Sequence, residues 1–259
     1  MLLAVDVGNT QTVLGVFNGE KLEWQWRFAT AGARTADELA LLFGGFLQQH
    51  GLSFSRQITG VAISSVVPDQ TQALREMVSR YFYFEPVVVE PGIKTGISIH
   101  TENPREVGPD RIVNALAAFS QFGGPCIVVD FGTATTYDAI SEAGEYLGGA
   151  IAPGVKVAAT GLFQATARLP RVELSLPRSL IGRNTIDALR SGLVFGTAAE
   201  VDGMVERMQK ELGGHAIVVA TGGLADLVVP LCETVDHFEP WLTLNGLRLI
   251  FEKNTGADD

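Results

Sequence analysis

The first hundred residues alternate apolar runs with amphipathic segments in an order typical of an α/β domain. Residues 2–5 and 12–17 are apolar runs that predict buried strands, and residues 22–28 alternate apolar with polar side chains, which predicts a half-buried strand. Asn18-Gly19 lies between the last two strands and predicts a two-residue hairpin turn. The pattern continues with a helix after Thr35, a strand at 61–67 closed by Pro68, a helix at 71–82 and a strand at 87–89.

The helix after Thr35 has a clear start signal. Thr35 and Glu38 have the spacing of a capping box, in which the Glu38 side chain reaches back to the cap residue. Apolar residues then recur at helical spacing from Leu39 to Leu47. We expect Trp24 and Trp26, on the strand before it, to pack in the core rather than to stack on a ligand.

The pattern restarts after residue 104, where Pro104 to Pro109 mark a break. Because a second series of strands and helices follows, we expect two domains, at residues 1–108 and 109–259. The second series comprises a helix after Pro109, strands at 126–129, 135–140 and 146–151, a helix capped by Thr185 and running to about 212, a strand at 216–220, a short helix through 227, a strand at 234–238 and a helix at 242–251.

Composition narrows the class of protein. The chain has 259 residues, of which 46% are hydrophobic and 19% charged, so it can bury a sizeable core. The formal net charge is −10 and the pI is about 4.9, which argues against a protein that grips nucleic acid phosphates. A local cradle of backbone N–H groups can still bind a small anion.

The acidic charge predicts that the protein has no nucleic acid partner, and cysteine content and hydropathy predict a cytoplasmic protein without a membrane anchor. Cys126 and Cys232 are too few for a disulfide scaffold and fit a reducing compartment, although one disulfide between them stays open. The apolar run at residues 2–5 is too short for a signal peptide, and no stretch approaches the roughly 18 apolar residues of a membrane helix.

Two buried strands end in the same short motif. Asp6-Val7-Gly8-Asn9-Thr10 follows one strand, and Asp130-Phe131-Gly132-Thr133-Ala134 follows another. Glycine lets backbone N–H groups approach phosphate oxygens, and a carboxylate at a strand end can hold a hydrated cation. The hydroxyl and amide side chains that add donors are Asn9, Thr10, Thr12, Thr133 and Thr135. One Asp-x-Gly is also compatible with an ordinary turn, but two copies favour a phosphate site.

A third motif, Gly108-Pro109-Asp110-Arg111, opens a predicted helix. Proline and an acidic residue are both favoured in a first turn, so the motif is also compatible with a plain helix start. Its functional interpretation makes Asp110 a general base for an alcohol and Arg111 an anion contact. Asn184-Thr185 is compatible with an N-cap or with a substrate contact in the same way.

The absence of several motifs excludes other classes. The chain has no Gly-x4-Gly-Lys-Ser/Thr, no Gly-x-Gly-x-x-Gly after a strand, no His-Glu-x-x-His and no Gly-x-Ser-x-Gly. These absences argue against a P-loop kinase, a Rossmann enzyme, a zinc protease and an α/β-hydrolase.

Taken together, the motifs resemble those of the type III pantothenate kinase family of the acetate and sugar kinase/actin superfamily. The resemblance runs through the whole chain, in order, on Asp6 to Thr10, Gly108 to Arg111, Asp130 to Ala134, Gly148 to Gly154, Gly182 to Thr185, Thr221 to Gly223 and Leu242 to Leu247. It implies two ribonuclease-H-like α/β domains with nucleotide bound between them. It also implies ATP-dependent phosphorylation of pantothenate at its 4′ hydroxyl, the first step towards coenzyme A, by a homodimer.

The resemblance also assigns roles by matching position. Asp110 would be the proton acceptor, Asp130 would hold a monovalent cation, K+ or NH4+, and Mg2+ would accompany ATP. The residues implied to bind ATP are Asp6, Val7, Gly8, Asn9, Thr10, Gln11, Thr12, Val13 and Thr133, and those implied to bind pantothenate are Gly108, Pro109, Asp110, Arg111 and Thr185.

Two other functions remain open on the residues alone. A nucleotide-gated binding protein on the same scaffold would keep both phosphate turns but need no acceptor base. A phosphoanhydride hydrolase would use Asp110 to activate water. The presence of Asp110-Arg111 and Asn184-Thr185 favours the kinase over the gate.

Overall fold

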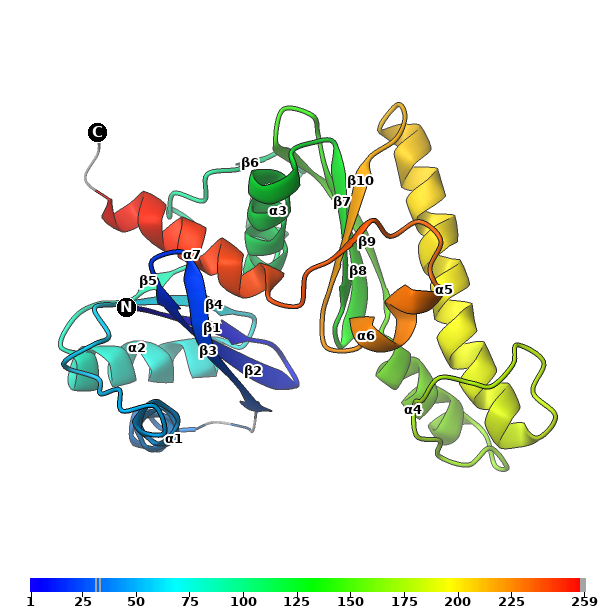
Figure 1. Ribbon diagram of the computed structural model, residues 1–259, viewed down its shortest axis with the longest axis horizontal. Coiled ribbons are helices and arrows are strands. Elements are labelled where there is room, and N and C mark those ends of the chain that lie inside the picture. The colour runs from blue at the N-terminus through cyan, green and yellow to red at the C-terminus, as the bar shows by residue number, and fades with distance from the viewer. Residues whose placement is uncertain (31, 33, 257–259) are drawn as a thin grey trace. The chain divides into compact units, whose positions relative to one another are not determined.

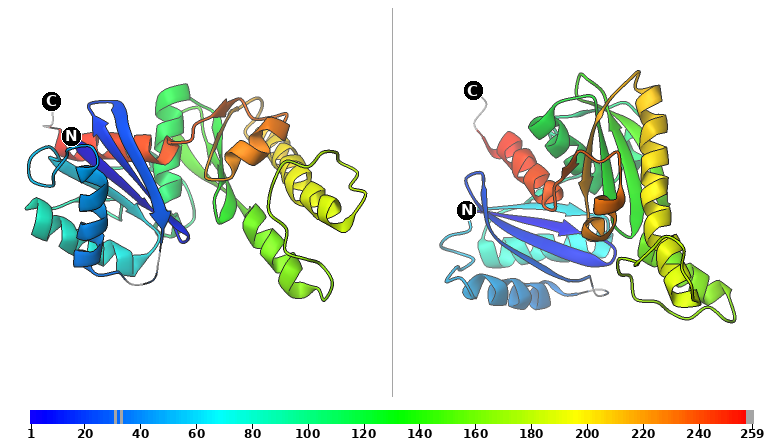
Figure 2. Two further views of the ribbon diagram at one scale, coloured as in Figure 1. Left: turned by 60° about the horizontal axis from the view of Figure 1, so that its bottom comes forward. Right: turned by 45° about the vertical axis from the view of Figure 1, so that its right-hand side comes forward.

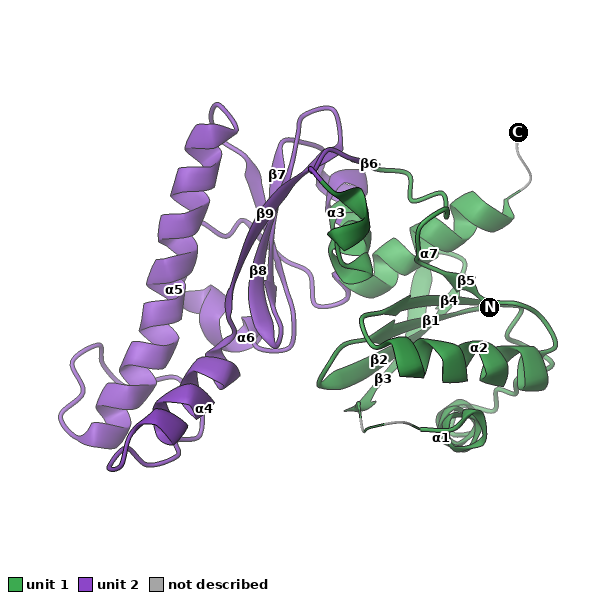
Figure 3. Ribbon diagram, turned by 180° about the vertical axis from the view of Figure 1, so that it is seen from behind, with its two compact units in different colours: residues 1–97, 103–117, 243–259 green, residues 98–102, 118–242 purple. Residues whose placement is uncertain are grey.

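The computed structural model describes residues 1–30, 32 and 34–256, which form two compact units (Figure 1, Figure 3). Unit 1 comprises residues 1–97, 103–117 and those from 243 onward, and unit 2 comprises residues 98–102 and 118–242. The division therefore differs from the single boundary expected after Gly108. Helix α3 (Pro109–Phe122) contributes to both units, and the last helix, α7 (Leu242–Thr255), returns the chain to unit 1.

Unit 1 is built on a five-stranded sheet in the order β3-β2-β1-β4-β5. Strand β2 pairs antiparallel with β1 and β3, whereas β4 and β5 continue parallel to β1. This is the series of three strands, helix, strand, helix, strand that the sequence predicts. The strands span Leu2–Val7 (β1), Gln11–Asn18 (β2), Lys21–Ala29 (β3), Gly60–Ser65 (β4) and Val87–Val88 (β5).

Helices cover both faces of this sheet (Figure 2). Helices α1 (Ala36–Gln48) and α2 (Pro68–Phe82) lie on one face, where their apolar side chains join Leu3, Val5 and Val7 of β1 in one core. Trp24 and Trp26 of β3 pack against that core, as expected. Helix α7 lies on the other face (Figure 2).

Helix α7 comes close to the sheet because the residues beneath it are small. A Cβ atom on Gly15 would lie 2.7 Å from a Leu244 side-chain carbon, and one on Gly60 would lie 2.1 Å from the Phe251 ring. Leu244 and Ile250 are accordingly buried. This packing explains why the C-terminal helix belongs to unit 1 and not to the domain that precedes it in sequence.

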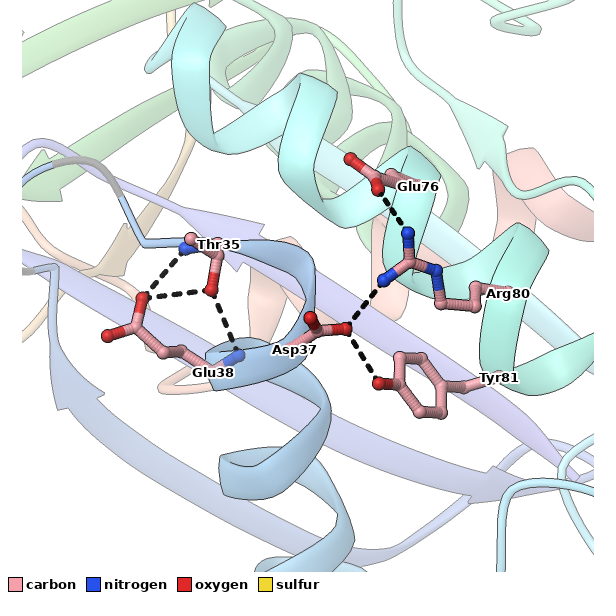
Figure 4. A network of polar contacts seen from close by, with 6 residues as sticks. All are labelled: Thr35, Asp37, Glu38, Glu76, Arg80 and Tyr81. Carbon is pink, nitrogen blue, oxygen red and sulfur yellow. Dashed lines mark hydrogen bonds and ion pairs between the residues drawn. The ribbon is translucent and has the colours of Figure 1, made fainter.

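The predicted capping box at the start of α1 is confirmed. The Glu38 backbone N–H donates to Thr35 Oγ1 at 3.3 Å, and Thr35 N donates to Glu38 Oε2 at 2.8 Å (Figure 4). Next to it, Asp37 accepts hydrogen bonds from Arg80 and from Tyr81 on α2, both at 2.7 Å (Figure 4). The first turn of α1 is therefore tied to the last turn of α2.

Unit 2 repeats the sheet topology of unit 1. Its sheet has the order β11-β10-β7-β8-β9-β6, in which β8 pairs antiparallel with β7 and β9, and β10 and β11 continue parallel to β7. The short strand β6 (Ser98–Ile99), which the sequence analysis missed, extends the sheet beside β9. The other strands span Cys126–Phe131 (β7), Ala134–Ile140 (β8), Glu145–Pro153 (β9), Ile217–Thr221 (β10) and His237–Phe238 (β11).

The long helix α5 (Thr185–Glu211) packs on one face of this sheet (Figure 1). Its residues Ala198, Val201 and Val205 recur at helical spacing and, with Leu193, join the core around β7 and β10. Helices α4 (Val155–Ala165) and α6 (Ala225–Val228) contribute to the same core. Within the described residues no helix combines the length and the apolarity that crossing a membrane requires.

Three local predictions need correction. The β2–β3 loop is Gly19-Glu20, because Asn18 still pairs with Lys21 and only Gly19 takes a positive φ, of 60°. Pro68 does not close the strand but begins α2, where its missing N–H costs nothing. Helix α5 is capped by Asn184, whose side chain accepts from Asp187 N at 2.9 Å, and Thr185 is the first helical residue.

Candidate active site

The first phosphate motif forms the turn between β1 and β2. Gly8 N donates to Gln11 O at 3.0 Å and closes a four-residue loop. The side chains of Asn9, Thr10 and Gln11 are exposed, whereas Thr12 is only 4% exposed. The loop itself is thus open to a ligand, and Thr12 belongs to its support.

Thr30, which follows β3, is a residue that the sequence analysis missed. Its backbone N–H donates to Thr10 O at 2.9 Å and its hydroxyl donates to Gly8 O at 2.8 Å. The Thr12 and Thr30 hydroxyls lie 2.9 Å apart and share a further hydrogen bond. No motif signals this role, because Thr30 lies 22 residues from Gly8 along the chain.

The second phosphate motif forms the equivalent turn between β7 and β8 and is one residue shorter. Gly132 N donates to Ala134 O at 3.0 Å. Gly132 and Thr133 are exposed, and Thr135, which occupies the position of Thr12, is 1% exposed. The two halves therefore present the same arrangement: exposed loop residues above a buried threonine.

Gly154, at the end of the glycine-rich segment 148–154, packs directly on the second turn. Its N–H donates to Thr133 O at 3.1 Å. A Cβ atom at this position would lie 2.4 Å from Thr133 O and 2.6 Å from Gly132 O. The close approach explains the glycine, which the sequence marks only as the last residue of a segment shared with the family.

Asp130 lies at the end of β7, against the turn that follows β10. Thr221 pairs with Asp130 across the parallel strands, and Gly222 adopts a φ of 100°. A Cβ atom on Gly222 would lie 2.4 Å from Asp130 Oδ1 and 2.5 Å from Phe131 N, so only glycine leaves room for this carboxylate and the backbone that follows it. The turn at Thr221-Gly222-Gly223 thus borders the residue expected to hold a cation.

Asp110 lies in the first turn of α3 and is backed by a glycine in the same way. A Cβ atom on Gly108 would lie 2.5 Å from Asp110 Oδ1. The Arg111 N–H donates to that oxygen at 2.9 Å, and Gly108 O accepts from Arg111 N and Ile112 N. Gly108 and Pro109 therefore form a helix start in which the Asp110 carboxylate is held against the N-terminal turn of α3.

Burial raises the pKa of Asp110, and the Arg111 N–H and guanidinium offset part of that rise. A raised pKa makes a carboxylate a stronger proton acceptor when it is ionised. Both cysteines are free thiols, and burial raises the pKa of each to about 12. Because such thiols stay protonated near neutral pH, neither cysteine is a candidate nucleophile.

Thr185 lines an open surface hollow of about 440 Å³ on unit 2, together with Asn184, Ile186 and Asp187. Its side chain is exposed, and Asn184 takes the capping role. The substrate-contact interpretation of Thr185 is therefore compatible with its position.

The predicted site residues are distributed over both units. Unit 1 carries residues 6–13 and 108–111, and unit 2 carries Asp130, Thr133 and Thr185. Among the described residues no three His, Cys, Asp or Glu side chains gather in a way that could hold a metal ion. A cation at Asp130 would need oxygen ligands from the main chain, from water or from a substrate.

Comparison with known proteins decides the family. The family model for type III pantothenate kinase matches residues 2–207. The chain belongs to this family. A type III pantothenate kinase from Moorella thermoacetica is 53% identical over 255 residues, covering 98% of this chain and all of the relative. One from Frankia alni is 54% identical with the same coverage. The enzyme class expected from the sequence is thereby confirmed.

Solved structures confirm the expected fold class, an α/β fold of two ribonuclease-H-like domains. An activator of 2-hydroxyisocaproyl-CoA dehydratase from Clostridium difficile, with bound ADPNP, aligns with a TM-score of 0.56 at 12% identity over all of this chain and 98% of its own. At these identities the likeness concerns the fold alone.

Proposed function

We propose that this pantothenate kinase transfers the γ-phosphoryl group of ATP to the 4′ hydroxyl of pantothenate, with Asp110 as the proton acceptor. Family membership over the full chain gives the reaction. The observation that supports the role of Asp110 is its position: a partly buried carboxylate with a raised pKa, for which Gly108 leaves the space. A helix start accounts for an acidic residue at this position, but burying its carboxylate is costly for folding.

ATP is assigned to the two turns. The exposed loop Gly8 to Gln11, with its flanks Asp6, Val7, Thr12 and Val13, would bind phosphate oxygens through backbone N–H groups and side-chain donors. Thr133 would do the same from the second turn. Pantothenate is assigned to Gly108 to Arg111 and to Thr185. Arg111 offers its carboxylate a planar, permanently charged partner.

Two cations fit these residues. Mg2+ binds nucleotide phosphates with only one or two protein carboxylates, so the lack of an acidic cluster is no obstacle. Asp130 is a single carboxylate against glycine backbone, a donor set suited to a large, weakly held ion such as K+ or NH4+. Bound there, the cation would offset phosphate charge. We place the reaction in the cytoplasm, which contains ATP and keeps cysteine thiols such as these reduced.

The deciding experiment incubates the protein with ATP, Mg2+ and pantothenate in Tris buffer, with and without KCl, and identifies the product by mass spectrometry. We expect 4′-phosphopantothenate only when potassium is present. Phosphate release without pantothenate would support the hydrolase instead. Full activity without potassium or ammonium would contradict the assignment of a monovalent cation to Asp130.

A homodimer is the proposed assembly. Unit 2 exposes large apolar side chains on α4, on the segment before α5 and on the first turn of α5, and burying such side chains favours association. These side chains are Leu162, Leu176, Leu180, Ile181 and Ile186. A second copy of the chain is the occupant that the family resemblance implies.

We expect Ile181→Glu to yield monomers in light scattering, because a charge in an apolar interface is costly. The control is Leu41→Glu on α1. Leu41 is 80% exposed and Ile181 is 79% exposed, so the two substitutions differ in place and not in accessibility. If the Ile181→Glu variant is still a dimer, the interface does not include Ile181.

A further inference from the structure

We propose that Thr30, directly after β3 in unit 1, and Gly154, directly after the equivalent strand β9 in unit 2, are each a positioning residue for the phosphate turn beside them. The inference rests on the proposed assignment of these turns to ATP. Neither residue belongs to the motifs that bind phosphate by the sequence argument. Each acts through the turn, not on the nucleotide.

The first support is a backbone hydrogen bond that occurs in both halves. Thr30 N donates to Thr10 O at 2.9 Å, and Gly154 N donates to Thr133 O at 3.1 Å. Strand β3 ends one residue before Thr30, and strand β9 ends one residue before Gly154. The two residues therefore hold equivalent carbonyls from equivalent places in the repeated topology.

A hydrogen bond that fixes the direction of a carbonyl group also fixes the direction of the N–H group in the same peptide unit. A trans peptide is planar, so its C=O and N–H point in opposite directions. The bond to Thr10 O therefore turns the Gln11 N–H away from Thr30, and the bond to Thr133 O turns the Ala134 N–H away from Gly154. An anion site built from backbone N–H groups depends on this orientation.

The side chains at the two positions meet opposite requirements. The Thr30 hydroxyl donates to Gly8 O at 2.8 Å and pairs with the buried Thr12 hydroxyl at 2.9 Å, so it fixes two further points of the first turn. At Gly154 any side chain would collide with Thr133 O and Gly132 O. The first turn needs a hydroxyl, and the second needs empty space.

Thr30→Val tests the first position, since valine keeps the shape and the backbone N–H but removes the hydroxyl. We expect the KM for ATP and the dissociation constant of a non-hydrolysable ATP analogue to rise about tenfold, the scale of one net hydrogen bond. The KM for pantothenate should stay unchanged, and Thr30→Ser should restore ATP binding. The control is Thr59→Val, whose hydroxyl bonds to Met1 O at the other end of β1.

Gly154→Ala tests the second position independently, should Thr30→Val fold poorly. The control is Gly161→Ala within α4, where a Cβ atom meets nothing within 4 Å. We expect Gly154→Ala, and not Gly161→Ala, to weaken binding of the analogue by tenfold or more. If the wild-type protein binds no ATP analogue, the proposed function fails. If it binds and phosphorylates normally while Thr30→Val and Gly154→Ala bind as tightly as their controls, only this inference is overturned.

Discussion

Two acidic side chains of the candidate site are each backed by a glycine. A Cβ atom on Gly108 would lie 2.5 Å from Asp110 Oδ1, and one on Gly222 would lie 2.4 Å from Asp130 Oδ1. The sequence predicted both carboxylates from their motifs but not the reason for these glycines. Gly222 lies far from Asp130 in sequence, and only the pairing of β7 with β10 brings them together.

Asp110→Asn should separate activity from stability. We expect turnover to fall roughly 10²–10⁴-fold, as for loss of a general base. Because burial raises the pKa of Asp110 in the folded state, folding disfavours its ionised form. The stability associated with this residue is present at acid pH and is lost as pH rises through the folded pKa.

The asparagine variant should therefore melt at the same temperature as the wild type or higher at pH 7, with the difference shrinking towards pH 4. Calorimetry over that range measures it. A melting temperature lowered equally at every pH would show that Asp110 is a structural residue.

Gly222→Ala should displace the Asp130 carboxylate together with the adjoining Phe131 backbone. We expect it to raise the potassium concentration needed for half-maximal activity several-fold, since cation ligation depends on the placement of the oxygen ligands. Gly213→Ala is the matched control. Gly213 also has a positive φ, of 86°, but a Cβ atom there meets nothing within 4 Å. If both variants need the same potassium concentration for half-maximal activity, Gly222 has no role in binding the cation.

At the scale of elements, prediction succeeded where the signal is local. The capping box at Thr35 and Glu38 involves neighbours in sequence, and it was correct in detail. The cap of α5 was assigned to Thr185, one residue too late, because Asn184 and Thr185 are both good N-caps and only the backbone decides between them. Strand β6 was missed because two residues beside β9 have no periodicity of their own.

Thr35→Ala should reduce the free energy of unfolding by about 1 kcal/mol, the usual loss for an N-cap. The ties from Asp37 to Arg80 and Tyr81 remain in this variant, so α1 should stay folded on α2. Chemical denaturation measures the loss, with the exposed Thr160→Val on α4 as control. Activity should be unchanged, and a large loss of activity would link this helix start to the site.

At the scale of the whole molecule, the chain is a repeat of one topology with different additions. The restart of the pattern near Pro104 revealed the repeat, and the two Asp-x-Gly turns marked equivalent places in it. The return of α7 to unit 1 could not be predicted, because it depends on small residues such as Gly15 and Gly60 on the sheet face that receives the helix. Thr30 was missed for a similar reason: its partners are distant in sequence.

The repeat predicts that both halves serve one reaction with ATP. Asp6→Ala and Thr133→Val should each weaken binding of an ATP analogue and lower kcat/KM for ATP about tenfold or more. Asp6 is a half-buried polar residue at the end of β1 beside the first turn, and Thr133 is an exposed residue of the second turn. Thr160→Val, an exposed threonine on α4, should leave both quantities unchanged. Isothermal titration and steady-state kinetics give the two measurements. If Asp6→Ala weakens binding while Thr133→Val matches its control, only the turn of unit 1 contributes to nucleotide binding. The similarity between the two turns would then reflect the repeated fold and not a common function.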